Sequence, residues 1–572
     1  MNALRTWLSL AVALAGCCVV VHSLVASFAL MPGLPYLDHL LLQAWFFHEV
    51  DEGREALFPF ELMRGNEHLV LFPMPLFWLD NELFAARGTL LVGITHAINW
   101  LCAWWLAGLA RRAFALDRAA WLATLAAIAA SLAWNVHGQN LCWPYQVHLY
   151  VWWLGWIAAA RCAEWADRSG SKRALAATLL CATVALYSFG FGIASFAALI
   201  AFALPRWPLR RSTLVVAVGA ALLALYWFGM ARGHLGAGMG DGGWLAHVAA
   251  IGGQCLYLLS MPLYFLLCAV LPQAAANVAA LALTGAAILF AAFCTARHLR
   301  RRQPPEPART AGALLVTAAV VGAVTTAISR AHLQGEAARA DRYAVLAVSF
   351  WLGALLFAVA LLPRRRDLAV VATAAAVLPL LLAAHFAPMR LLVMRGQREM
   401  LVAAEMAVLD GVDDPTALVH LHPDYADPRM LPRVARGLRE RQWSLFAGPQ
   451  DEWLGRRLGE LFPAKVAPIR GFVQSAVPVA AGRPGIRVDG YAFDPVHGVA
   501  PEWIVLVDPQ DVVVGVGHRR RREVAELMGH LPRDLDPSLD PDGFWVGYLQ
   551  APVTGELRAF AIVGDGAAAL TR

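Results

Sequence analysis

The chain has 572 residues, of which 59% are hydrophobic and only 15% are charged; its mean hydropathy is +0.54 and its net charge is +6. Soluble domains carry roughly 25% charged residues, so this composition excludes a wholly soluble protein. The apolar runs are predicted to be helices, because an isolated strand leaves backbone polar groups unsatisfied in hydrocarbon. Arginines gather at the ends of these runs, so the positive charge reflects membrane topology, and we expect no nucleic-acid partner.

Apolar runs long enough to cross a bilayer, roughly 17–25 residues each, begin with a span at 6–30 that we predict is not cleaved. Residues 174–204 have basic flanks on both sides and a break at 187–192, which predicts a hairpin of two short helices. Residues 244–272 are predicted to be re-entrant or interfacial, with a break at Ser260-Met261-Pro262. The other predicted spans are 88–110, 119–135, 145–162, 212–230, 275–296, 309–328, 343–362 and 368–387.

This arrangement predicts a polytopic α-helical membrane protein with about 11 transmembrane helices, a cytoplasmic N-terminus and an external C-terminal third. It places five basic clusters on one face, which the positive-inside rule assigns to the cytoplasm. Those clusters are Arg111/Arg112, Arg161 to Arg173, Arg206 to Arg211, Arg297 to Arg302 and Arg364 to Arg366. The external face then receives residues 31–87, 135–146, 232–243 and 329–343.

The chain divides into a transmembrane domain at 1–389, an external mixed α/β linker region at 390–480 and an external β-sandwich at 481–572. Helical periodicity at 390–411 predicts a juxtamembrane helix. Short apolar runs separated by Gly, Pro and Asp predict the strands of the sandwich. These runs are 486–493, 503–507, 512–516, 544–549 and 557–563.

The first external loop, 31–87, is too long and too patterned for a passive connector. Asp38 follows the first span in PYLDHLL, where a partly sheltered carboxylate can act as a base on a hydroxyl; the alternative is a helix N-cap. Asn66, Glu67 and His68 precede a segment, 66–84, that we expect to lie flat on the membrane with Phe72, Leu76, Phe77 and Leu83 on one apolar face. Glu67 or His68 is predicted to position an acceptor or accept a proton, or else only to solvate the start of the helix.

No cofactor is firmly implied. His39, His48, Glu49 and His68 are potential metal ligands, but no His-Glu-x-x-His spacing supports a divalent metal site.

Two arginines, Arg330 and Arg342, stand at the outer ends of adjacent spans, against the positive-inside trend. A guanidinium binds phosphate oxygens bidentately, so both arginines are candidates for phosphate binding beside Tyr343. The alternative is that they snorkel to lipid headgroups.

Residues 135–146 supply amides and aromatic rings, including Gln139 and Asn140, which suit sugar hydroxyls and the apolar face of a sugar ring. An ordinary interfacial aromatic belt is the alternative for Trp143, Trp152 and Trp153.

The order of these features resembles the GT-C class of integral-membrane glycosyltransferases, in an uncharacterised bacterial branch. The resemblance rests on an acidic residue after the first span, a long first external loop, many spans and an external C-terminal domain. It is carried by NEHLVLFPMPLFWLDNELF at 66–84, YSFGFG at 187–192 and SRAHLQGEAARADRY at 329–343.

The resemblance implies a bacterial inner-membrane enzyme that transfers a sugar from a polyprenyl-phosphate donor to a glycan or lipid acceptor of the cell envelope on the periplasmic face. Asp38 would deprotonate the acceptor for inverting attack, and Arg330 and Arg342 would hold the donor phosphate. Many members carry a second acid after the first, whereas His39 follows Asp38 here, which leaves Glu49, Asp51 or Glu67 as alternative bases. His39 and Asn66 join Tyr343, Gln139 and Asn140 as predicted substrate-binding residues. The C-terminal sandwich resembles carbohydrate-binding modules in its strand rhythm and in three aromatics expected to be exposed, Tyr491, Trp503 and Trp545.

Two other classes fit the composition. A transporter or lipid-linked-sugar flippase predicts charged or Gly/Pro-broken helices at the bilayer midplane. A non-enzymatic assembly protein predicts a blander first loop.

Overall fold

The computed structural model describes residues 2–45, 64–65, 68–229, 243–300, 306–329, 339–362, 366–421, 430–527, 536, 538–550 and 556–571. The chain forms two compact units, each described here by itself. The first comprises Met1–Ala29, Phe58–Trp78 and Thr89–Leu391. The second comprises Leu30–Leu57, Leu79–Gly88 and Leu392–Arg572.

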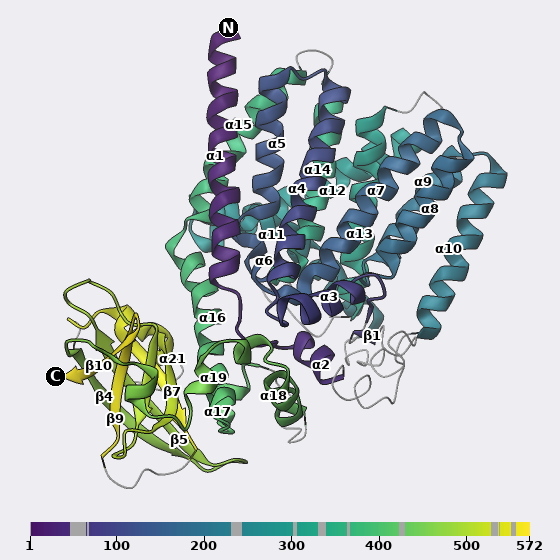
Figure 1. Cartoon of the computed structure of the whole chain (residues 1–572). Helices are drawn as coiled ribbons and strands as arrows, with labels where there is room; N and C mark the ends of the chain where they lie inside the picture. The colour runs from purple at the N-terminus through teal and green to yellow at the C-terminus, as the bar shows by residue number, and fades with distance from the viewer. Residues whose placement is uncertain are drawn as a thin grey trace. The chain divides into compact units, whose positions relative to one another are not determined.

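The first unit is a bundle of helices (Figure 1). Within the described part of the chain, nine helical stretches are long and apolar enough to cross a membrane, which confirms a polytopic helical membrane protein. They contain α1 (Asn2–Ala29), α4 (Thr89–Phe114), α5 (Arg118–Ala133) continued by α6 (Gly138–Cys142), α10 (Leu209–Gly229), α11 (Gly243–Cys268), α12 (Gln273–Arg300), α13 (Pro307–Ser329), α14 (Ala344–Leu361) and α15 (Arg366–His385).

Three further bundle helices fall short of that criterion: α7 (Val147–Ser169), α8 (Lys172–Leu186) and α9 (Gly192–Arg206). The first carries charges in its last turns, and the other two have only 15 residues each. All three contribute to the bundle core, where Trp152, Trp153 and Trp156 are fully buried. The interior location of these tryptophans rules out the interfacial belt for Trp152 and Trp153.

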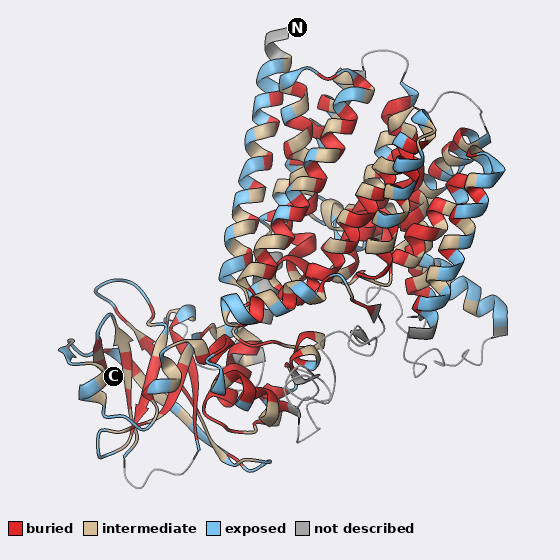
Figure 2. Cartoon of the chain, turned by 45° about the vertical axis from the view of Figure 1, so that its right-hand side comes forward, coloured by how far each residue is buried: buried red, intermediate tan, exposed pale blue. Residues whose placement is uncertain are grey.

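Burial divides the bundle into inner and outer helices (Figure 2). In the apolar stretch of α14, 67% of the residues are buried inside the protein, whereas in those of α10 and α12 only 22% are. Outer helices with large exposed apolar side chains are typical of a lipid-facing surface.

The predicted hairpin at 174–204 is confirmed as α8 and α9, with the break where YSFGFG stands. A Cβ added at Gly192 would lie 2.1 Å from the Cα of Leu186, so only glycine fits where the two helices meet. At the other end of α8, Gly170 closes α7 with a positive φ of 66°, and Ser171 caps α8 by accepting the Ala174 N–H.

The predicted break at Ser260-Met261-Pro262 is wrong, because α11 runs through it with Pro262 inside the helix. Proline removes one backbone donor, and neighbouring groups in a helical bundle compensate for that loss. Trp351 Nε1 of α14 donates to the Leu259 carbonyl at 2.9 Å, and Ser260 Oγ donates to the Tyr257 carbonyl at 2.8 Å. A local sequence pattern does not reveal such partners.

Basic residues of the predicted clusters stand in the last turns of α4, α7, α9 and α12, and these helix ends lie at the end of the bundle where the N-terminus is marked in Figure 1. We call it the basic end. Arg5 pairs with Asp367 at 2.5 Å, and Arg206 pairs with Asp167 at 2.9 Å. At the ends of α12 and α13, His298 Nε2 lies 3.3 Å from the Thr310 hydroxyl.

The opposite end of the bundle, which we call the loop end, is made by η2 (Asn135–His137), α6, η3 (Pro144–Gln146), residues 187–191 and η5 (Asp341–Tyr343). The chain leaves α10 and enters α12 at this same end. Tyr226 of α10 packs against Tyr187 with ring centroids 5.9 Å apart, and Asn277 of α12 accepts a hydrogen bond from Arg339 at 2.6 Å.

The second unit joins two early segments to the C-terminal third of the chain. Gly33 N donates to Glu405 Oε1 at 2.7 Å, and Leu37 N donates to the Leu421 carbonyl at 2.5 Å. Ser444 N donates to the Ala85 carbonyl at 2.6 Å. Its helices are α2 (Asp38–Trp45), the second half of α3 (Met74–Phe84), α16 (Pro388–Leu409) from Leu392 onward, α17 (Pro415–Leu418), α18 (Met430–Glu440), η6 (Ser444–Ala447), α19 (Gln450–Trp453), α20 (Leu458–Leu461), α21 (Arg522–Leu527) and η7 (Pro541–Gly543).

The strands of the second unit form one sheet of eight, in the order β3-β10-β4-β5-β8-β7-β6-β9, with β10 also paired to β9. The five predicted strands are confirmed, but the predicted sandwich is wrong, because the extra pairing closes a single barrel-like sheet. The strands are β3 (Ala464–Lys465), β4 (Ile469–Val479), β5 (Gly485–Phe493), β6 (Trp503–Val507), β7 (Val513–Arg520), β8 (Phe544–Leu549), β9 (Arg558–Val563) and β10 (Gly566–Thr571).

The expected exposure of three aromatics on this sheet is largely wrong. Tyr491 and Trp545 are each 1% exposed, and Trp503 is half-buried with its ring edge-on to His518 at 4.6 Å. Trp545 packs with the inward-facing residues of the sheet, Tyr491 packs with Leu539 and Phe544, and Trp503 packs against the cluster that contains Val505 and Val507. None of the three rings is the exposed aromatic surface expected of a carbohydrate-binding module.

Candidate functional site

The loop end of the bundle brings together predicted substrate-binding residues that are 200 positions apart in the sequence. Asn140 Nδ2 of α6 donates to the Asp341 carbonyl of η5 at 2.8 Å. Asn140 is fully buried, and its Oδ1 has no hydrogen-bond partner among the described residues. Gln139, half-buried, precedes it, and Arg342 and Tyr343 follow Asp341.

Arg342 is half-buried, with its guanidinium carbon 5.2 Å from the centre of the Tyr343 ring. Its Nε is buried and has no hydrogen-bond partner within the described part of the chain. A guanidinium supported by an aromatic face and with a spare donor is suited to an anion such as phosphate.

A second arginine, Arg339, is held in a cage at the same end. It is only 4% exposed, and its guanidinium lies 3.8 Å from the Tyr264 ring and 4.7 Å from the Tyr257 ring. It donates to Ser260 Oγ at 3.2 Å and to Asn277 Oδ1 at 2.6 Å. These contacts hold the segment that leads into η5. Arg339 is also a second positive charge near Arg342 in the sequence.

A row of aromatic rings crosses the loop end. Tyr145 contacts His148 with centroids 4.5 Å apart, and His148 contacts Phe189 at 4.8 Å. Phe189 contacts Phe191 at 4.8 Å, which in turn lies 6.4 Å from Tyr343. The row therefore connects the YSFGFG break with η5, two of the three stretches that carry the family resemblance.

Other polar groups of residues 135–146 are used inside the bundle. Asn135 N donates to His385 Nδ1 at 3.1 Å, and His385 Nε2 lies 2.9 Å from His22 Nδ1. Because Nδ1 of His385 accepts a backbone N–H, its proton is on Nε2 and is donated to His22. Asn135 thus ties together three elements of the bundle, η2, α1 and α15.

Asp38 and His39 belong to the second unit, so the structure does not group them with Arg342. Asp38 is the first residue of α2, half-buried, and follows Leu37, which has a φ of 49°. A carboxylate in the first turn is stabilised by the helix dipole. Leu37, whose carbonyl accepts the Leu41 N–H, and not Asp38, stands at the N-cap position. His39 is 4% exposed, and burial lowers its pKa to about 4, so it is neutral at pH 7.

Near Asp38, α2 packs against the second half of α3 through a buried polar contact. Gln43 Nε2 donates to Asn81 Oδ1 at 2.8 Å, and Gln43 Oε1 is buried with no hydrogen-bond partner among the described residues. Asp80, 1% exposed, accepts the Gly88 N–H at 2.7 Å. A buried cluster of neutral amides beside a carboxylate is suited to a polyhydroxylated ligand.

The structure describes the part of segment 66–84 from His68 onward. Phe77 is buried, Phe72 and Leu83 are 36% and 69% exposed, and Asp80 and Asn81 are buried. The second half of α3 therefore buries polar side chains against α2 and leaves apolar side chains uncovered, and its predicted place flat on the membrane stays a prediction.

Several predicted residues lie outside the described part of the chain: Asn66, Glu67, Arg330, His48, Glu49 and Asp51. His68 is described only through its backbone, in β2 (His68–Leu69), which pairs with β1 (Arg64–Gly65). Their predicted roles remain predictions.

The sequence pattern did not single out Arg339, Asn277, Gln43 or Asn81 as site residues. Asn81 and Gln43 belong to short helices that also carry charged residues, so nothing in the sequence distinguished them from surface side chains. Arg339 lies in a polar loop, where nothing in the sequence distinguishes a caged arginine from a solvated one.

Within the described residues, no group of three His, Cys, Asp or Glu side chains is placed to hold a metal ion. Comparisons with protein-family models, with curated proteins and with solved structures return no match to this chain.

Proposed function

We propose that the protein is a membrane glycosyltransferase of the GT-C type, which transfers a sugar from a polyprenyl-phosphate donor to a cell-envelope acceptor, a glycan or a lipid. The observation that carries the proposal is the Asn140–Asp341 hydrogen bond, which fixes Arg342 and Tyr343 against the amide-bearing α6 at the loop end. Guanidinium, amide and aromatic groups are the partners that a sugar phosphate requires.

In this proposal Arg342 binds the donor phosphate, the leaving group, and stabilises the negative charge that develops on it. Caged Arg339 adds positive potential and holds the segment in position. Asp38 is assigned as the base that takes the acceptor proton, an assignment based on its sequence position and its half-buried place at the start of α2. The loop end then faces the periplasm, because the opposite end carries the basic clusters. The C-terminal third is assigned to the periplasm from the sequence prediction.

The test is transfer from a defined polyprenyl-phosphate sugar by the purified full chain. Asp38→Asn is expected to lower kcat by about 100-fold or more, the usual loss on removing a general base. Arg342→Gln is expected to raise KM for the donor about tenfold through loss of a charge-assisted hydrogen bond. Arg210→Gln, at an exposed position of the basic end, is the matched control. Normal turnover by Asp38→Asn would refute the base assignment, and an unchanged donor KM in Arg342→Gln would refute the phosphate site.

One observation favours a transporter or flippase as the second candidate. His22 of the apolar helix α1 is linked to His385, the last residue of α15, and Pro379 lies inside α15; polar and proline residues in apolar helices are typical of transport pathways. Movement of a lipid-linked sugar across vesicles containing the protein, without any transfer product, would favour this alternative.

A further inference from the structure

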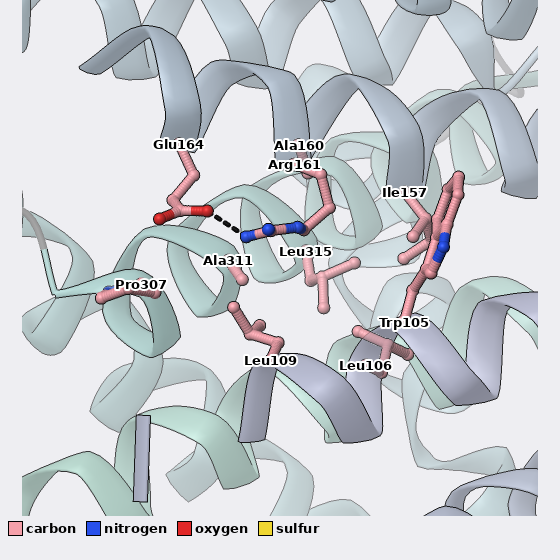
Figure 3. A pocket seen from close by; sticks show the side chains of 10 residues that line it. All are labelled: Trp105, Leu106, Leu109, Ile157, Ala160, Arg161, Glu164, Pro307, Ala311 and Leu315. Carbon is pink, nitrogen blue, oxygen red and sulfur yellow. Dashed lines mark hydrogen bonds and ion pairs between the residues drawn. The ribbon is translucent and has the colours of Figure 1, made fainter. Parts of the chain in front are cut away.

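A shallow groove, open to its surroundings, lies between three helices of the first unit, α4, α7 and α13 (Figure 3). Its charged residues, Arg161 and Glu164, stand in the C-terminal half of α7, toward the basic end of the bundle. The lining residues are Trp105, Leu106, Leu109, Ile157, Ala160, Arg161, Glu164, Pro307, Ala311 and Leu315.

The groove has one charged edge and an otherwise apolar lining. In Figure 3, Arg161 and Glu164 lie along α7, with Leu109 of α4 and Ala311 and Leu315 of α13 facing them. Such a lining excludes a polar metabolite as the main occupant, because buried polar groups would find no partners there.

The charged edge has a surplus of positive charge. Glu164, whose side chain is 1% exposed, pairs with both Arg161 and Arg168. Arg112 lies close enough to Arg161 to act on it electrostatically. Two guanidinium groups thus pair with one carboxylate and a third acts on Arg161, and this surplus favours an anion at the mouth of the groove.

Arg161 retains hydrogen-bonding capacity for that anion. Its side chain is 28% exposed, and its ion pair with Glu164 uses Nη1. A guanidinium has five N–H donors in a planar fork, and this geometry matches phosphate oxygens.

The length of the groove limits the apolar part of the ligand. From Pro307 to Leu315, α13 rises by roughly 12 Å, at 1.5 Å per residue. This length accommodates a segment of one acyl chain and is far too short for a whole polyprenyl chain.

We propose that this groove binds one anionic glycerophospholipid, with the headgroup phosphate on Arg161 and part of one acyl chain on the apolar lining. The site is separate from the glycosyltransferase proposal and does not depend on it.

The test is native mass spectrometry of the full chain in detergent, titrated with phosphatidylglycerol or with phosphatidylcholine of the same acyl chains. The wild type is expected to retain one phosphatidylglycerol about tenfold more tightly than phosphatidylcholine, the effect of one charge-assisted contact. Equal binding of the two lipids would overturn the proposal.

Two variants separate the headgroup from the acyl chain. Arg161→Gln removes the proposed phosphate contact and lowers the positive charge, while Glu164 keeps its ion pair with Arg168, and it should abolish the preference for the anionic lipid. Ala311→Phe fills the groove and should weaken both lipids about tenfold, whereas Arg210→Gln should leave binding unchanged. A preference that persists in Arg161→Gln, or full binding by Ala311→Phe, would show that the lipid sits elsewhere.

Discussion

At the scale of single residues, the second unit contains a glutamate, Glu399, whose burial disfavours the charged form of its carboxyl group near neutral pH. Glu399 of α16 accepts the Arg521 N–H at 2.7 Å, but its burial raises its pKa from about 4.5 to about 7. The unfolded chain therefore releases this proton near pH 4.5 and the folded protein near pH 7. Between these values the folded state binds more protons, so the free energy of unfolding falls as the pH rises.

We expect Glu399→Gln to remove this pH dependence and to stabilise the protein by about 2 kcal/mol above pH 7, since one pKa unit corresponds to about 1.4 kcal/mol and the group is only partly shielded. The measurement is the thermal unfolding midpoint of the full chain in detergent, from pH 5 to pH 8. The wild-type midpoint should fall relative to that of the variant between pH 5 and pH 7. Above pH 7 the two midpoints should change in parallel. Parallel curves over the whole range would contradict the assignment.

At the scale of elements, the junction of α8 and α9 depends on the absence of a side chain. An added Cβ at Gly192 would lie 2.1 Å from Leu186 Cα and 2.5 Å from the Ala185 carbonyl oxygen, both backbone atoms that cannot move independently. The same junction positions Phe189 and Phe191 in the aromatic row, so its geometry affects the loop end directly.

Gly192→Ala should therefore destabilise the bundle by about 1–3 kcal/mol, the usual cost of overpacking a closed site. Gly252→Ala in α11 is the matched control, because nothing lies within 4 Å of its added Cβ and alanine favours the helix. The yield of monodisperse protein and its thermal midpoint should drop for Gly192→Ala only. Equal behaviour of the two variants would refute the steric argument.

The elements themselves were largely predictable from the sequence, and their packing was not. Hydropathy located the long helices, the YSFGFG break and five strands, because these depend on local periodicity. The Trp351 hydrogen bond to α11 and the contact of α3 with α2 each join residues that are far apart in the sequence. Closure of the sheet depends on β10 pairing with both β4 and β9, which alternation within a strand does not encode. The predicted site divided in the same way: the 135–146 and 339–343 segments were found, but the cage around Arg339 was not.

At the scale of the whole molecule, the second unit is assembled from distant segments. Leu34 and Leu40 from the start of the chain share a hydrophobic cluster with Val408 and Leu438. The C-terminal third is therefore needed to cover the first loop.

Truncation after Leu391 should expose that apolar surface and yield an aggregated bundle, as judged by size-exclusion chromatography. Leu34→Ala and Leu40→Ala in the full chain should each cost about 2–5 kcal/mol, since both side chains are less than 5% exposed. A truncated chain as monodisperse as the full one would show that the early segments do not need this partner.

The segmented construction of the second unit has a consequence for biosynthesis. Gly88 ends the last early segment of that unit, and Leu392 begins its next one, so 304 positions separate them (392 − 88). A ribosome adding about 5–20 residues per second needs roughly 15–60 s to make that stretch. For at least this time the carbonyl of Ala85 and the amide of Leu37 lack their partners, Ser444 and Leu421, which lie further along the chain than Leu392. During this period Leu34 and Leu40 of the nascent chain are uncovered and can be bound by chaperones. Slower translation lengthens the period.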